Sequence, residues 1–157
     1  MRRVIVCVLI ALLAGCGFHL RAQVALSYST LHVSGPSGTS LTNLLMRVLR
    51  SSGVRLVDRK EDAEVTLVIL SDVKEKSILS LSAAGRAQEY ELRERVAFRI
   101  ITAGKSDLPA GEIISQRSIS FNDVQVLAKE SEESLLYRDM ENDVVQQLLR
   151  RLEAANK

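Results

Sequence analysis

Residues that could carry catalysis are scarce in this chain of 157 residues, which has two histidines and two cysteines. His19 lies three residues after Cys16, close to the N-terminus, where a substrate pocket is hard to build. His32 lies in a short predicted strand, where a lone histidine is most often at the surface or already hydrogen-bonded. No glycine-rich phosphate loop, His-Glu-x-x-His or Gly-x-Ser-x-Gly motif occurs. We therefore expect no catalytic residue and a protein that is not an enzyme.

A cluster of three acidic residues, Glu130, Glu132 and Glu133, could hold a cation. These residues lie near the predicted start of the last helix. Carboxylates in that position most often interact with the helix dipole and cap the first turn. We favour this structural role, and we expect no metal site and no cofactor.

Basic side chains gather on one predicted strand, where Arg93, Arg95 and Arg99 share a parity, and Arg86 lies near the preceding turn. One interpretation is a solvated strand face whose charge is balanced by glutamates. The other is a surface that meets anionic groups such as phosphates, to which arginine donates paired hydrogen bonds. Nucleic acid is a poor candidate for that anion, because the chain has only three Phe, three Tyr and no Trp for base stacking.

The N-terminus predicts export and lipidation. Arg2 and Arg3 precede an apolar run, Val4–Leu13, that is too short to cross a bilayer as a helix and typical of a signal peptide. Small residues then lead to Cys16, as in a lipobox, whose cysteine sulfur is acylated. The alternatives are an ordinary secretory signal with a chance cysteine, or a short buried helix. We expect a signal peptide over 1–15, a lipid on Cys16 and a tether over 16–25.

Removal of this leader changes the charge and the thiol content. The full chain has 21 Lys plus Arg and 19 Asp plus Glu, so loss of Arg2 and Arg3 leaves a formally neutral mature protein. Cys7 is lost with the signal and Cys16 is used by the lipid. The mature chain therefore has no thiol for a disulfide or a metal site.

The first predicted elements are a strand and a helix. Leu31 and Val33 alternate with polar residues and indicate a short strand. Thr39 or Ser40 can cap a helix that ends near Gly53. Its apolar face follows a period of 3.6 residues and consists of Leu41, Leu44, Leu45, Val48 and Leu49.

Further along the chain the pattern changes to strands. Val54–Val57 is a brief extended piece, and Val65–Leu70 predicts a buried strand that continues toward Leu81. Ala83–Arg86 would form the tip of a hairpin.

The next strand has the clearest alternation in the chain, with apolar residues on one parity: Tyr90, Leu92, Val96, Phe98 and Ile100. Glu94 interrupts this parity, and we expect it to lie near a sheet edge. A fourth strand follows over Glu112–Asn122.

The chain ends in a long predicted helix, from about Ser131 to Ala154. Its apolar residues repeat every four positions: Leu136, Met140, Val144, Leu148 and Leu152. The element order β-α-β-β-β-α predicts an α+β fold, with two helices packed on one face of a four-stranded, mixed, mostly antiparallel sheet. No element remains to cover the other face of the sheet.

Four sequence stretches resemble the LptE family of lipopolysaccharide-assembly lipoproteins: Cys16–Arg21, Leu49–Val54, Gly85–Leu92 and Leu127–Lys129 with the final helix. The resemblance implies one α+β domain over 26–157. It also implies a protein that plugs and helps assemble the outer-membrane β-barrel LptD, which delivers lipopolysaccharide to the outer leaflet. Gly17 after the lipidated cysteine resembles lipoproteins sent to the outer membrane, which places the anchored chain on its periplasmic side.

The resemblance also implies direct lipopolysaccharide binding. Lys129 matches a basic position, in a loop, that the family is thought to use. Ala83 stands where the family has a hairpin arginine, so Arg86 is the substitute, with Arg93 and Arg95 as further candidates. The alternatives are a lipoprotein subunit of another envelope lipid-transport complex and a lipid-anchored hydrolase, for which His32 or Glu94 would be the base.

Overall fold

The computed structural model describes residues 26, 28–104, 109–121 and 126–155. The predicted signal peptide, the lipidated Cys16 and the tether over 16–25 lie outside these described residues. Within the described ranges, no helix is both long and apolar enough to span a membrane.

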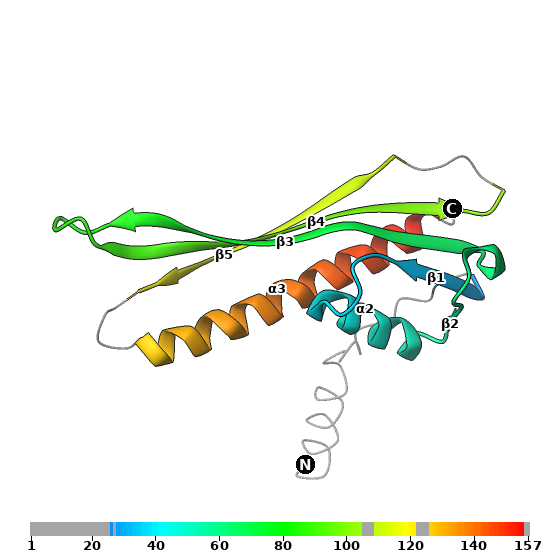
Figure 1. Ribbon diagram of the computed structural model, residues 1–157, viewed down its shortest axis with the longest axis horizontal. Helices are drawn as coiled ribbons and strands as arrows, with labels where there is room; N and C mark the ends of the chain where they lie inside the picture. The colour runs from blue at the N-terminus through cyan, green and yellow to red at the C-terminus, as the bar shows by residue number, and fades with distance from the viewer. Residues whose placement is uncertain (1–25, 27, 105–108, 122–125, 156–157) are drawn as a thin grey trace, which may run out of the picture.

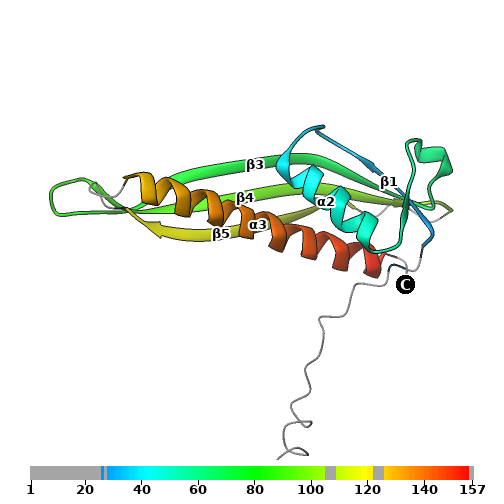
Figure 2. The same ribbon diagram turned by 90° about the horizontal axis from the view of Figure 1, so that it is seen from below.

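The described chain forms a layer of two helices on one face of a five-stranded sheet (Figures 1 and 2). In chain order the elements are β1 (Thr30–Ser34), α2 (Ser40–Ser51), β2 (Arg55–Leu56), the 3-10 turn η1 (Lys60–Asp62), β3 (Val65–Leu81), β4 (Ala87–Thr102), β5 (Gly111–Ser120) and α3 (Val126–Ala154). The strand order is β2-β1-β3-β4-β5. β1 is parallel to β2 and β3, while β3, β4 and β5 are antiparallel. The predicted α+β class is confirmed, and the two-residue β2 adds a fifth strand to the predicted four.

Helix α2 follows its sequence pattern closely. Thr39 is the N-cap, and its hydroxyl accepts a hydrogen bond from the Thr42 amide at 3.1 Å. The predicted apolar face points into the core, where Leu41, Leu45 and Leu49 are fully buried. Gly53 follows the C-cap with a φ of +82°, a left-handed conformation that glycine adopts without strain.

Strands β3 and β4 form a long hairpin whose tip is the predicted Ala83–Arg86 segment. The Ser82 amide donates to the Arg86 carbonyl at 2.7 Å, and the Gly85 amide donates to the Ser82 carbonyl at 2.9 Å. The strand register shifts on either side of Leu70 and again on either side of Leu79, as expected for β-bulges. Figure 2 shows that the hairpin extends beyond β5 and α3.

Helix α3 begins five residues earlier than predicted, at Val126 rather than Ser131. The prediction was late because Leu127, in the first turn, is 80% exposed and does not continue the buried apolar stripe. Glu130, Glu132 and Glu133 therefore lie beyond the first helical turn, which contains no acid. Their predicted role as partners of the helix N-terminus is wrong. The predicted apolar stripe is correct, since Met140, Val144, Leu148 and Leu152 are fully buried.

The buried apolar residues form two clusters. The larger cluster lies beneath α2 and the C-terminal half of α3, and it includes Leu31, Leu67 and Phe98. The smaller cluster consists of Leu92, Ile119 and Met140, with Tyr90, Leu136 and Tyr137 packed against it. The helical residues in this group, Leu136, Tyr137 and Met140, all come from α3.

Glu94 corrects a prediction made from the sequence. It was expected near a sheet edge, but β4 lies between β3 and β5, and Glu94 is fully buried. The break in apolar parity marks a polar position inside the protein instead. The partners of this carboxyl come from β3 and α3, which are distant in sequence, so the pattern of β4 alone could not reveal them.

Candidate functional site

Two of the predicted lipopolysaccharide contacts, Arg93 and Arg95, lie on the face of the sheet opposite the helices. Their β4 neighbours Leu92, Glu94 and Val96 point toward the helical layer and are buried. The Arg93 guanidinium lies 2.8 Å from a Glu91 carboxylate oxygen, and Arg95 lies 3.6 Å from Glu112. Both arginines therefore already have carboxylate partners, as the interpretation of a charge-balanced strand face expects.

The other two predicted contacts lie elsewhere. Arg86 is an exposed residue at the end of the hairpin tip, and its amide donates to the Ser82 hydroxyl at 3.1 Å. Lys129 was expected in a loop but lies in the first turn of α3, with its side chain only 16% exposed. Its ammonium contacts Glu132 at 2.8 Å and the Ser120 hydroxyl at 3.2 Å. The structure thus places Arg93 and Arg95 on the outer face of β4, Arg86 at the hairpin tip and Lys129 on α3 beside β5.

The described residues that were candidates for catalysis or metal binding do not form such a site. The Nδ1 atom of His32 lies 3.0 Å from the Val57 carbonyl oxygen, so the imidazole contacts the backbone just after β2. Among the described residues, no three His, Cys, Asp or Glu side chains are grouped to hold a metal ion.

A polar layer, which the sequence did not reveal as a unit, crosses the protein between the two apolar clusters. Its centre, Glu94, Ser115 and Glu141, is buried, whereas Ser40 and Lys74 lie at its exposed margin. Lys74, Glu94 and Ser115 are register neighbours on β3, β4 and β5 and form one row across the sheet. Glu141 of α3 lies above this row and is only 6% exposed. We define the polar layer as Ser40, Asp72, Lys74, Glu94, Ser115 and Glu141.

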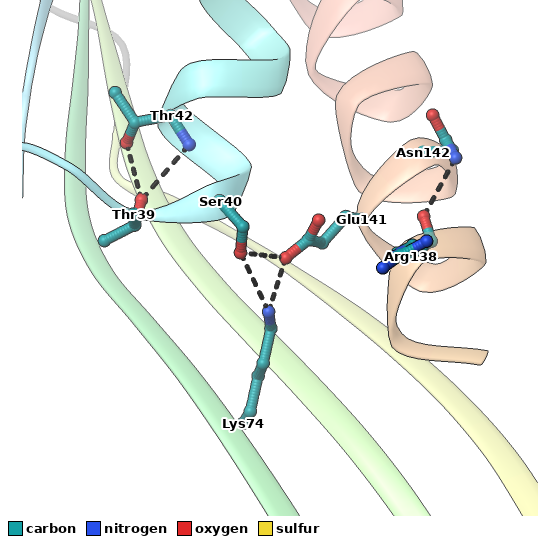
Figure 3. Close-up of polar contacts among 7 residues, drawn as sticks. All are labelled: Thr39, Ser40, Thr42, Lys74, Arg138, Glu141 and Asn142. Carbon is teal, nitrogen blue, oxygen red and sulfur yellow. Dashed lines mark hydrogen bonds and ion pairs between the residues drawn. The ribbon is translucent and has the colours of Figure 1, made fainter. Parts of the chain in front are cut away.

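Figure 3 shows how the helices and the sheet meet at this layer. The Glu141 carboxylate accepts hydrogen bonds from the Lys74 ammonium and from the Ser40 hydroxyl at the start of α2. The Lys74 ammonium also donates to the Ser40 hydroxyl at 3.2 Å. One lysine of β3 therefore joins both helices to the sheet.

Glu94 has no such cation in hydrogen-bond contact, and neither of its carboxyl oxygens has a donor partner. The pKa of Glu94 is raised to about 7, chiefly by burial, with Lys74 lowering it and the charges of Asp72 and Glu141 raising it. Burial also raises the pKa of Asp72. Because no hydrogen bond reaches the Glu94 carboxyl, its neighbours act on it through their charges, and burial favours its protonated form.

The polar layer has a structural role rather than a catalytic one. Although burial lowers the pKa of Lys74, its hydrogen bond to Glu141 and the surrounding carboxylates raise it more, so this lysine stays charged. The sequence signals that could have found the layer are Glu94 in an apolar parity and Glu141 directly after the buried Met140.

Further ion pairs join α3 to the sheet. Lys76 of β3 lies 2.5 Å from Glu133, and Arg117 of β5 pairs with Asp143. The Tyr137 hydroxyl donates to the Glu75 carbonyl at 3.1 Å. A groove of about 430 Å³ runs along this junction and is lined by Ser40, Lys74, Glu130, Glu133, Ser134, Tyr137, Arg138 and Glu141.

Comparison with known proteins agrees with this architecture. The family model described as LptE, Lipopolysaccharide-assembly, matches residues 28–152. The LPS-assembly lipoprotein LptE of Pectobacterium atrosepticum is 30% identical over 148 residues, which cover 91% of this chain and 79% of that protein. The corresponding protein of Yersinia enterocolitica is 31% identical over 144 residues, covering 88% of this chain and 69% of that protein.

Solved structures show the same fold. The solution structure of lipoprotein B from Nitrosomonas europaea superposes with a TM-score of 0.76 and 39% identity, covering 89% of this chain and 92% of that one. The crystal structure of the rare lipoprotein B from Shewanella oneidensis gives a TM-score of 0.73 and 29% identity, covering 81% of this chain and 96% of that one. The resemblance found in the sequence is confirmed: the chain belongs to the LptE family of lipopolysaccharide-assembly lipoproteins.

Proposed function

We propose that this non-enzymatic lipoprotein of lipopolysaccharide assembly is the partner of an LptD-type outer-membrane β-barrel. In this proposal a lipid on Cys16 anchors the mature chain to the periplasmic side of the outer membrane. The protein plugs the barrel, helps it assemble and assists the delivery of lipopolysaccharide to the outer leaflet.

The observation that carries the barrel contact is the face of the sheet that no described helix covers (Figure 1). Both helices pack on the opposite side. The outer face of β3, β4 and β5 is therefore formed by the polar residues that alternate along the strands with those facing the helices. One row across this face consists of Val73, Arg95 and Ile114, whose apolar members are 43% and 46% exposed. A polar face with a small apolar centre suits contact with the inner wall of a barrel, if that wall carries both polar and apolar side chains.

The first test is a pull-down of the tagged protein from solubilised outer membranes, with the partners identified by mass spectrometry. We expect a stoichiometric large β-barrel. A lipid-transport complex without such a barrel would refute the proposal and favour the alternative of another envelope lipoprotein subunit.

Substitutions then test the face itself. Val73→Asp and Ile114→Asp place a charge at exposed positions of the outer face and should reduce recovery of the barrel. Leu135→Asp is the matched control, because Leu135 is 58% exposed but belongs to α3. Equal recovery from all three variants would show that the outer face is not the contact.

Direct binding of lipopolysaccharide is a second part of the proposal, with Lys129, Arg86, Arg93 and Arg95 as its basic residues. Arg93 and Arg95 lie on the outer face of the sheet, Arg86 lies at the hairpin tip, and Lys129 lies in α3. Single alanine variants, compared for lipopolysaccharide binding, would identify which location contributes. Unchanged affinity in all four variants would remove these residues from the binding site.

A further inference from the structure

The N-terminal half of α3 is held to the sheet differently from the rest of the helical layer. Beyond the polar layer, α2 no longer lies beside it (Figure 2). Its buried apolar contact is the smaller cluster of Leu92, Ile119 and Met140, which the polar layer separates from the main core. This segment can therefore open without disturbing the larger cluster, since the two share no continuous apolar packing.

The ion pairs between α3 and the sheet are all oriented in the same way. In the three ion pairs between α3 and the sheet that the structure describes, the sheet supplies the cation and the helix supplies the carboxylate. The cations are Lys74, Lys76 and Arg117. Lys76 also lies 4.6 Å from the centre of the Tyr90 ring, beside the apolar cluster.

Removal of this half-helix would uncover an apolar strip, formed by Leu92, Ile119 and Tyr90, beside Lys76, whose partner Glu133 leaves with the helix. An acyl chain fits the strip, and a phosphate fits the Lys76 ammonium as the Glu133 carboxylate does. The helix itself thus occupies the positions that an anionic amphiphile would take.

We infer that residues 126–139 of α3 form a displaceable lid over a binding site for the acylated, phosphorylated end of lipopolysaccharide. The inference rests on the proposed function and adds to it a site beneath the helix, in which Lys129 belongs to the lid itself and Lys76 is the cation beneath it. Lys76 contacts the phosphate, and the polar layer is the line at which the lid separates from the fixed part of α3.

The two partners of one ion pair give opposite predictions. Lys76→Gln and Glu133→Gln both break the same pair and loosen the lid to a similar extent. Glu133→Gln leaves the sheet cation in place without its competitor, so it should strengthen amphiphile binding about two- to fivefold. Lys76→Gln removes the cation that the ligand needs and should weaken binding by a similar factor.

The assay is calorimetric titration of the mature chain carrying Cys16→Ala, which leaves the described fold untouched, with dodecyl phosphate below its critical micelle concentration. Dodecyl maltoside, with the same chain and no charge, should show no difference between the variants. Asp62→Asn is the control variant, since it breaks the exposed Arg59–Asp62 pair on η1, far from the lid. Changes of the same sign at Lys76 and Glu133, or no change at either, would overturn the inference.

Hydrogen exchange supplies an independent readout of the opening. Amides of residues 129–139 should exchange faster than those of residues 144–152, and dodecyl phosphate should raise exchange in the first segment only. Uniform protection along α3 would overturn the lid. Equal binding of lipopolysaccharide to the wild type and both variants would also overturn the lid, while leaving the proposed function intact. Absence of a barrel from the pull-down would refute the proposed function alone.

Discussion

Glu94→Gln tests the physical account of the polar layer. The pKa of this carboxyl rises from an ordinary 4.5 to about 7 in the folded chain, chiefly because of burial. Glutamine keeps the size of the protonated acid and cannot ionise. The substitution therefore removes the cost of burying a charge without emptying the site.

The sign and size of the effect follow from proton linkage. Because the folded state holds the proton more tightly than the unfolded state, the favourable contribution of Glu94 is complete below pH 4.5. It is lost as the pH rises toward 7. At about 1.4 kcal/mol per pKa unit, the interval from 4.5 to about 7 corresponds to about 3 kcal/mol. Burial raises the pKa of Asp72 too, which adds a loss of the same sign.

Urea unfolding at pH 5 and pH 8 measures this difference. Wild-type stability should fall between these pH values, and Glu94→Gln should remove most of the fall, so that the variant exceeds the wild type by about 3 kcal/mol at pH 8 only. Glu61→Gln, at an exposed position on η1, controls for the loss of one negative charge. A variant that is less stable than the wild type at pH 8 would mean that Lys74 stabilises the Glu94 carboxylate, which would refute the reasoning.

Three further predictions concern the core and the anchor. Phe98→Ala should lower the free energy of unfolding by about 3–5 kcal/mol in urea titration, because the ring is only 5% exposed; a much smaller loss would contradict its core position. Gly111→Ala should cost about 1–3 kcal/mol in the same assay, since an added Cβ would lie 2.7 Å from the Phe98 ring; a neutral change would show that the ring moves aside. Cys16→Ala should release the protein from the outer-membrane fraction on cell fractionation, because stable anchoring requires the lipid; retention there would show that the barrel contact alone holds it.

The sequence predicted those elements whose own residues determine them. The capped helix α2, the hairpin tip and the apolar stripe of α3 each carry a local pattern that packing reinforces. The start of α3 was missed because residues such as Leu127 form helix without being buried. Lys129 consequently moved from a predicted loop into a helical turn with two polar partners.

The candidate site was less predictable, because its contacts join distant parts of the chain. Lys74 and Glu141 are separated by 67 residues, and neither segment alone shows that the two side chains meet. Glu94 did stand out, but a charged residue in an apolar parity fits both a sheet edge and a buried polar contact. Only the strand order and the position of α3 distinguish the two, and these are properties of the tertiary fold.

The free-energy cost of the polar layer and its position both support the proposal that the N-terminal half of α3 is a lid. A continuous apolar core would spare the protein the buried Glu94, and a buried ionisable group is rarely the most stable choice for a core. The layer lies where α2 begins, as the Ser40–Glu141 contact shows, and beyond it α3 is held to the sheet by a small apolar cluster and the partly exposed Lys76–Glu133 pair. Such a pair contributes little to stability in water. The polar layer thus interrupts the apolar packing along α3 at the point where the proposed lid would separate.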